Sequence, residues 1–258
     1  MSTLLLKINP PLQSWGVDSK FYQTRSTSRY PSKSGVIGMI CAALGWDRTH
    51  DLSALRKLRM GVRIDQPGRL EKDYHTAAGH LERDGVANLS TTKVTERWYL
   101  ADAAFIVGLE STDTAWLNEI AGALADPRWN MFAGRKSCPV NYDLVIGVVN
   151  DGLEDALSVT LTPLIESKTR GSSRCQHDRW GKTVECIIEG VSGDDVFEAN
   201  DDPLSFDPSH RLFAPRTVSR LWYSTETKTA PTMDIWGGDD EDELMSAVES
   251  AGRTDEID

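Results

Sequence analysis

Residues 98–109 read W-Y-L-A-D-A-A-F-I-V-G-L, an apolar stretch that predicts a strong β-strand. A helix is predicted directly after it, from Asp113 to Ala125, because apolar residues recur there on one helical face. A further strand is predicted over Tyr142–Val149. The stretch therefore begins a strand, helix, strand unit.

The chain upstream of this unit has the same order of elements. A short apolar run over Thr3–Ile8 predicts a strand, Ser34 is a plausible N-cap for a helix over Gly35–Leu44, and Arg59–Asp65 alternates like a strand. A polar excursion, Arg69–Lys93, separates the two halves. The resulting βαββαβ order predicts an α+β, ferredoxin-like fold, which is also the scaffold of the RRM, the commonest single-stranded-RNA module.

The chain after residue 150 is harder to interpret. Short strands are expected over Leu157–Leu164, Thr183–Ile188 and Leu221–Ser224. The segment 237–258 holds nine acidic residues against one arginine, which predicts a solvated tail, frayed or disordered. We therefore expect a ferredoxin-like RNA-binding domain over 1–150 with a protruding excursion at about 69–93, a smaller β-rich C-terminal part over 151–236, and an acidic tail over 237–258.

Charge is distributed unevenly along the chain. The formal net charge is −11, which by itself argues against a polyanionic partner. Residues 1–100, however, carry 15 basic and 9 acidic side chains, whereas residues 193–258 carry 5 and 17. A basic N-terminal part within an acidic protein is the asymmetry expected if one face contacts phosphates.

Composition excludes several other classes of protein. No run approaches the ~20 apolar residues that cross a bilayer, and the first apolar run is too short for a signal peptide. We therefore expect a cytoplasmic protein with no membrane partner. The four cysteines show no C-x-x-C spacing and the five histidines are scattered, so neither a zinc site nor a dithiol motif is predicted. No cofactor is expected.

Two basic clusters are the main candidates for a binding surface. Residues 131–139 read M-F-A-G-R-K-S-C-P, and residues 25–38 read R-S-T-S-R-Y-P-S-K-S-G-V-I-G. Glycine permits backbone N–H groups to approach an oxyanion, and neighbouring Arg and Lys supply charge. The alternative is a pair of solvated turns, which short Gly/Ser/basic runs commonly form.

Individual residues of these clusters suggest specific contacts. Ser32, Lys33 and Ser34 precede a predicted helix, whose free N–H groups favour a phosphate. Arg25 and Arg29 could reach phosphates or stack on unpaired bases. Arg135, Lys136 and Ser137 would form a second phosphate cradle.

Two further candidates lie outside the clusters. Trp15, between Ser14 and Gly16, is either a platform for base stacking or a core tryptophan. Arg211 and Arg216 flank Phe213 and could clamp more RNA, but a salt bridge to the acidic C-terminal part is equally ordinary.

Taken in chain order, the motifs resemble those of the fifth Cas protein family, and specifically the type I-E subunits of the CRISPR surveillance complex Cascade. The resemblance spans about residues 3–222. It is carried by Gln13-Ser14-Trp15-Gly16, Arg25-x-Thr27, Pro31-Ser32-Lys33-Ser34-Gly35-x-x-Gly38, Asp73-Tyr74-His75-Thr76, Arg97-x-Tyr99-Leu100-x-Asp102-Ala103-x-Phe105, Gly134-Arg135-Lys136-Ser137-Cys138-Pro139 and Arg211-x-Phe213-x-x-Arg216.

The resemblance implies a non-catalytic subunit that caps the 5′ handle of the CRISPR RNA, with the excursion serving as a thumb. The implied partners are this RNA, the adjacent backbone subunit, the large subunit and, through the assembled complex, target DNA. The acidic tail is not part of the family pattern. The RNA-binding residues expected on this basis are Gln13, Trp15, Arg25, Thr27, Arg29, Ser32, Lys33, Ser34, Tyr74, His75, Arg135, Lys136, Ser137, Arg211 and Arg216.

A second function stays open at this stage. Type I-C relatives resemble metal-independent endoribonucleases that use a Tyr, a Lys and a His, and Lys72, Tyr74 and His75 provide these residue types in one stretch. The type I-E pattern instead implies that another subunit cuts the RNA. We therefore expect Tyr74 and His75 to support the thumb or contact RNA.

Overall fold

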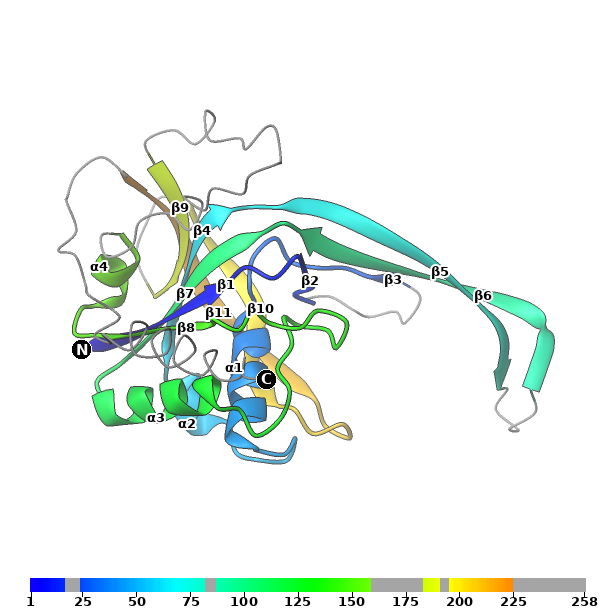
Figure 1. Ribbon diagram of the computed structural model, residues 1–258, viewed down its shortest axis with the longest axis horizontal. Coiled ribbons are helices and arrows are strands. Elements are labelled where there is room, and N and C mark those ends of the chain that lie inside the picture. Colours follow the sequence, from blue (N-terminus) through cyan, green and yellow to red (C-terminus); the bar gives the residue numbers. More distant parts are fainter. Residues whose placement is uncertain (17–23, 82–86, 159–182, 191–194, 225–258) are drawn as a thin grey trace, which may run out of the picture. The chain divides into compact units, whose positions relative to one another are not determined.

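The computed structural model describes residues 1–16, 24–81, 87–158, 183–190 and 195–224 of the chain (Figure 1). The fold is mixed α+β with a mainly antiparallel sheet, as predicted. The acidic segment 237–258 lies outside the described residues. Among those residues, no helix is long and apolar enough to cross a membrane.

Within the described residues the main sheet has seven strands, and all the pairings between them are antiparallel. Its central strands are mostly buried because both faces of the sheet are covered. In spatial order the strands are β10 (Asp195–Ser205), β11 (Leu212–Ser224), β9 (Thr183–Glu189), β4 (Arg59–Gln66), β7 (Ala104–Ser111), β1 (Ser2–Ile8) and β8 (Val145–Val149).

Helices cover the two faces of this sheet unequally. The longer helices α1 (Lys33–Leu44) and α3 (Thr114–Ala125) pack on one face, where Leu4, Leu6 and Phe105 are fully buried (Figure 1). The short α4 (Leu153–Ser158) packs on the other face with residues of opposite strand parity, including Leu5, Ile106 and Ile188. A further short helix, α2 (Ser53–Arg56), precedes β4.

The start of α1 differs slightly from the prediction. Its N-cap is Ser32 instead of Ser34, and the Ser32 hydroxyl accepts a hydrogen bond from the N–H of Gly35 at 3.3 Å. The helix ends at Gly45, which adopts φ 72° and whose N–H bonds to the last carbonyls of the helix. Asp113 caps α3 through the N–H of Trp116.

The apolar stretch 98–109 is two strands, so the prediction of one strand was wrong. β6 (Ala87–Ala101) ends and β7 begins on either side of Asp102, which adopts φ 55°. Opposite this bend, the chain turns between β4 (Arg59–Gln66) and β5 (Arg69–Leu81) at Gly68, which adopts φ 68°. An added Cβ at Gly68 would lie 2.6 Å from the carbonyl oxygen of Ala101. The two bends carry the chain out of the main sheet at the same point.

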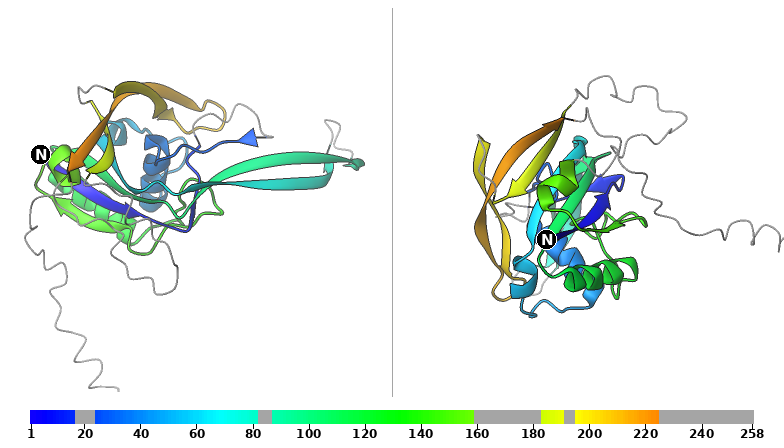
Figure 2. Two further views of the ribbon diagram at one scale, coloured as in Figure 1. Left: turned by 90° about the horizontal axis from the view of Figure 1, so that it is seen from above. Right: turned by 90° about the vertical axis from the view of Figure 1, so that its left-hand side faces the viewer.

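The polar excursion is a long β-hairpin of β5 and β6, which Figure 1 shows as a twisted ribbon and the left view of Figure 2 shows from above. Every side chain from Arg69 to Ala77 is exposed, so an apolar face is not needed for the strand to form. Near its base, β6 also pairs with β2 (Leu12–Gln13) and β3 (Thr24–Arg25). Backbone hydrogen bonds between β5 and β6 hold the hairpin in its extended form. Hydrophobic periodicity gives no information about such bonds.

The C-terminal strands extend the main sheet. β9 pairs with β4, and the predicted strands at Thr183 and Leu221 belong to β9 and β11, whereas β10 was not predicted. Leu157 was expected in a strand but lies in α4, because two glycines of the sheet leave room for the helix. An added Cβ at Gly61 would lie 2.6 Å from Leu157 Cδ1, and one at Gly108 would lie 2.6 Å from Leu153 Cδ1. Residues 159–164 lie outside the described residues.

Candidate nucleic-acid interface

Lys33, a predicted phosphate ligand at the start of α1, points into the protein. Its side chain is 2% exposed, and its Nζ donates to both carboxylate oxygens of Glu189 at 2.9 and 3.0 Å and to the carbonyl of Arg56 at 3.1 Å. Its backbone N–H donates to Asp201. The prediction that Lys33 binds RNA was therefore wrong, because all its donors are directed at protein acceptors.

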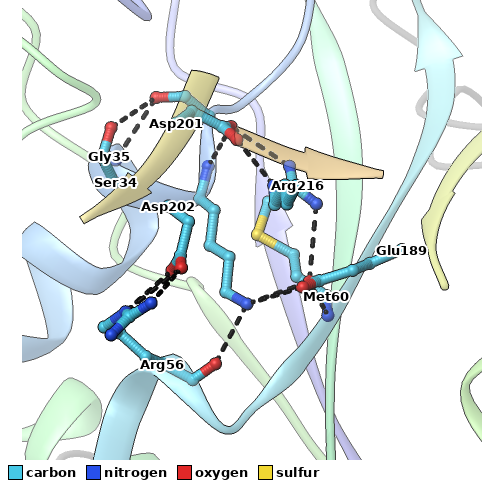
Figure 3. Close-up of polar contacts among 10 residues, drawn as sticks. Ser34, Gly35, Arg56, Met60, Glu189, Asp201, Asp202 and Arg216 are labelled. Atoms are coloured by element: carbon cyan, nitrogen blue, oxygen red, sulfur yellow. Dashed lines mark hydrogen bonds and ion pairs between the residues drawn. The ribbon is translucent and has the colours of Figure 1, made fainter. Parts of the chain in front are cut away.

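Arg216 is also a structural cation (Figure 3). Its guanidinium donates two hydrogen bonds to Asp201, at 2.6 and 3.1 Å, and one to Glu189 at 3.5 Å. Burial opposes its charge, but the bond to Asp201 prevails and raises the pKa of Arg216. The salt bridge to the acidic C-terminal part was the correct alternative. We call Lys33, Arg56, Glu189, Asp201, Asp202 and Arg216 the ion network; Arg56 joins it by donating to Asp202.

Trp15 is a core residue and offers no surface for base stacking. Its side chain is 0% exposed, and its ring lies against Gly35 of α1, where an added Cβ would be 2.8 Å from Cε3. Its indole N–H donates to Gln13, whose amide donates in turn to the carbonyl of Ala103. Thr27 fixes the same segment by accepting from the backbone N–H of Trp15 at 2.8 Å. Gln13, Trp15 and the buried cap Ser32 are therefore structural.

The second cluster forms a loop with two exposed polar side chains and a half-buried Arg135, whose Nη1 atom is buried. Lys136 and Ser137 are exposed, and the Arg135 guanidinium lies 4.8 Å from the centre of the Tyr99 ring. Arg135 Nη2 donates to the backbone carbonyl of Arg25 at 3.1 Å, which joins the two predicted clusters. The Arg135 Nη1 atom has no hydrogen-bond partner in the described part of the chain.

Gly134 has a different role from the one predicted. It adopts φ 89°, and an added Cβ would lie 1.8 Å from the carbonyl oxygen of Ser14. Its N–H donates to the carbonyl of Phe132, and Ser14 donates its N–H to Ala133. The glycine therefore permits the loop to pack closely against the backbone of Ser14, next to Trp15, instead of approaching a ligand.

Arg211 extends the positive surface from the connection between β10 and β11. It is exposed, and its guanidinium lies 5.2 Å from the centre of the Phe213 ring. Burial, followed by the like charges of Arg48 and Arg25, lowers the pKa of Arg211. Arg48 was missed because it lies in an ordinary polar turn after α1. We call Arg25, Arg48, Arg135, Lys136 and Arg211 the basic surface.

The arginines of the basic surface differ from six other described arginines, although Arg29, Arg97 and Arg128 likewise form no ion pair within the described residues. Arg56, Arg59, Arg63, Arg69, Arg216 and Arg220 each form an ion pair with a carboxylate. For Arg25, Arg48, Arg135 and Arg211, the described part of the chain offers no such pair. Like charges that gather without counterions favour an anionic ligand.

The remaining predicted residues lie just before α1, in its first turn, or on the hairpin. Arg29 is exposed, and Ser34 is half-buried with its hydroxyl 3.4 Å from that of Ser32. Tyr74 is 59% exposed on β5, and His75 Nδ1 lies 3.4 Å from the Thr95 hydroxyl. The structure thus keeps Tyr74 and His75 accessible.

The three residue types of an endoribonuclease do not converge. Lys72, Tyr74 and His75 lie on one strand, whose side chains alternate between faces, so that His75 points away from the other two. Lys72 is paired with Glu96 at 3.3 Å. Among the described residues, no group of three His, Cys, Asp or Glu side chains could hold a metal ion.

A comparison with protein families identifies the chain. The model of the CRISPR-associated protein family Cas5 matches residues 3–219. This chain belongs to the Cas5 family. The family assignment agrees with the resemblance carried by the sequence motifs.

Individual relatives of this Cas5 chain are subunits of CRISPR complexes. CasD, a Cascade subunit of Escherichia coli K12, is 35% identical over 161 residues, which cover 57% of this chain and 70% of the relative. A chain of a solved CRISPR RNA-guided surveillance complex aligns with a TM-score of 0.71 and 30% identity, covering 96% of this chain and 99% of that one. The crystal structure of a Cas protein aligns with a TM-score of 0.62 and 31% identity, covering 87% and 96%.

Proposed function

We propose that this chain binds and caps the 5′ repeat-derived handle of the CRISPR RNA as a non-catalytic subunit of type I-E Cascade. The observation that carries the proposal is the basic surface, whose arginines gather without any carboxylate partner among the described residues. RNA phosphates are suitable counterions, since guanidinium groups bind them with charge-assisted hydrogen bonds.

The strand arrangement supports a ferredoxin-like core for this subunit. Strands β4, β7, β1 and β8 are adjacent and antiparallel in that order, with α1 and α3 on the crossovers. This is the arrangement expected for a βαββαβ unit. The partners we propose are the CRISPR RNA, the adjacent backbone and large subunits, and target DNA through the assembled complex, in the cytoplasm.

Exposed Tyr74 and His75 fit this function better than an endoribonuclease. A general base must reach the proton that it abstracts, and Lys72, Tyr74 and His75 lie on alternating sides of one strand. We therefore assign Tyr74 and His75 to contacts of the thumb with RNA or with a neighbouring subunit.

RNA binding by the purified full-length chain tests the proposal. The double substitution Arg135→Ala and Lys136→Ala should weaken binding of a handle RNA and lower the slope of log K against log salt concentration by about 1.4, since each phosphate on a single strand contributes about 0.7. The matched control is Lys57→Ala, which removes an exposed cation beside α2. An unchanged affinity and slope for the double variant would show that the basic surface does not bind RNA.

A further inference from the structure

Tyr99 contacts two of the three polar residues in the loop of the basic surface. It lies on β6 opposite Glu71 of β5, within the base of the hairpin. The ring centre is 4.8 Å from the Arg135 guanidinium, and the phenol oxygen is 3.4 Å from the Ser137 hydroxyl. The half-buried side chain of Tyr99 thus connects the sheet of β2, β3, β5 and β6 to the loop over residues 132–139.

Arg135 is held from two directions. The aromatic face of Tyr99 lies on one side, and Nη2 donates to the backbone carbonyl of Arg25. A flat guanidinium stacked on a ring and tethered by one N–H has fewer accessible rotamers than a free arginine. Such ordering of the side chain before binding reduces the entropy lost when a phosphate is bound.

The contacts of Arg135 with Tyr99 and with the Arg25 carbonyl use few of its N–H donors. A guanidinium has five N–H donors; in Arg135 the Nη2 group donates to a described protein acceptor, and Nη1 is buried without one among the described residues. The Tyr99 ring accepts no conventional hydrogen bond, so it can orient Arg135 without using the donors that a phosphate requires. A carboxylate in its place would orient the arginine but compete with RNA for it.

We propose that Tyr99 is a positioning residue that orders Arg135 for phosphate binding by stacking beneath its guanidinium. This inference rests on the proposed function, because it concerns the same RNA. Tyr99 acts through Arg135, and its removal should weaken RNA binding only while Arg135 is present.

A double-mutant cycle with handle RNA tests this role. In the wild-type background Tyr99→Leu should weaken binding about fivefold, the size of one exposed cation–π contact. In the Arg135→Ala background the same change should weaken binding less than twofold, since residues that act together are not additive. Tyr99→Phe keeps the ring and should bind within about twofold of wild type. The loss of the Tyr99→Leu effect in the Arg135→Ala background is the readout that a merely structural role would not produce.

The outcomes separate the two proposals. If Tyr99→Leu weakens binding equally in both backgrounds, or if Tyr99→Phe is as weak as Tyr99→Leu, the positioning role is wrong while the basic surface stands. If Arg135→Ala combined with Lys136→Ala leaves binding unchanged, the proposed function fails first. Should Tyr99→Leu unfold the chain, Arg135→Lys replaces the test: it retains charge without the flat group, so the salt slope should persist while affinity falls about fivefold.

Discussion

The Nζ atom of Lys33 lies 2.9 Å from Oε1 of Glu189, which joins the first residue of α1 to the last residue of β9 across 156 positions of the chain. Arg216 contacts the same carboxylate from β11. The ion network therefore fastens α1 to the C-terminal strands (Figure 3). A lysine at a helix start, which by sequence suits a phosphate, is here part of the framework.

Lys33 and Lys136 should respond oppositely to the same substitution. Lys33→Met removes the buried ammonium that Glu189 and the Arg56 carbonyl bind, and should destabilise the fold by about 3 kcal/mol. Lys136→Met removes an exposed charge and should leave stability within about 0.5 kcal/mol. Denaturant unfolding measures the stability of both variants. RNA titration measures their affinity, which should fall only for Lys136→Met. A stable Lys33→Met protein with weakened RNA binding would return Lys33 to the interface.

Gly134→Ala should disrupt the loop of the basic surface. The added methyl group would overlap the Ser14 carbonyl, 1.8 Å away, at a φ of 89° that alanine rarely adopts. We expect a loss of about 2 to 4 kcal/mol together with weaker RNA binding.

The matched control is Gly122→Ala in α3, where nothing lies within 4 Å of the new methyl group. Helix propensity should make that variant more stable by about 0.5–1 kcal/mol. Thermal unfolding compares the two variants. Equal stability of both would mean that the loop is not packed against Ser14.

Glu154 should stabilise the fold at neutral pH but not in acid. Its hydrogen bond with Arg59 outweighs burial and lowers the pKa of Glu154 in the folded state. The contribution is therefore complete above the unfolded pKa and is lost as pH falls through the folded one.

Glu154→Gln tests this dependence by thermal unfolding between about pH 7 and about pH 3. Because Glu154 is partly exposed, the variant should be less stable than wild type by under ~1 kcal/mol at neutral pH, a shift of a few degrees in Tm. The difference should disappear in acid. A constant difference across the range would show that the charge is irrelevant.

Deletion of Glu71 to Thr91 should leave the folded body nearly as stable as before, because the described side chains of β5 up to Ala77 are exposed. The base of β6 would keep its pairing with β2 and β3. The shortened protein should assemble poorly into Cascade, which co-purification with the other subunits would reveal. Normal assembly would contradict the thumb role, and loss of folding would place the hairpin in the core.

The isolated protein should not cleave repeat RNA, because Lys72, Tyr74 and His75 do not converge. Gel analysis of labelled repeat RNA checks this expectation, with His75→Ala as the matched variant. A site-specific product that forms with wild type and disappears with His75→Ala would establish the endoribonuclease instead.

Sequence reasoning succeeded where the signal is local. The apolar runs of β1 and β4 and the spacing in α3 are continuous in the sequence, and these elements lie where they were predicted. The exposed position of Lys136 also follows from its turn-forming neighbours.

Partners distant in the sequence explain the misses. Nothing near Trp15 indicates that Gly35 of a helix will cover it, and the acceptor for Lys33 is a glutamate on a strand far along the chain. The break at Asp102 lies inside an unbroken apolar pattern, because a single positive φ leaves no trace in periodicity.

The bends at Gly68 and Asp102 separate the reach of the hairpin from the architecture of the body. Both strands leave the main sheet at one level, where Arg69 pairs with Ala101 and Gln66 pairs with Ala104. One residue could be added to or removed from both β5 and β6 beyond the bends without changing any strand pairing of the main sheet. Evolution can therefore adjust how far this arm extends in two-residue increments, while selection on folding acts on the rest of the molecule.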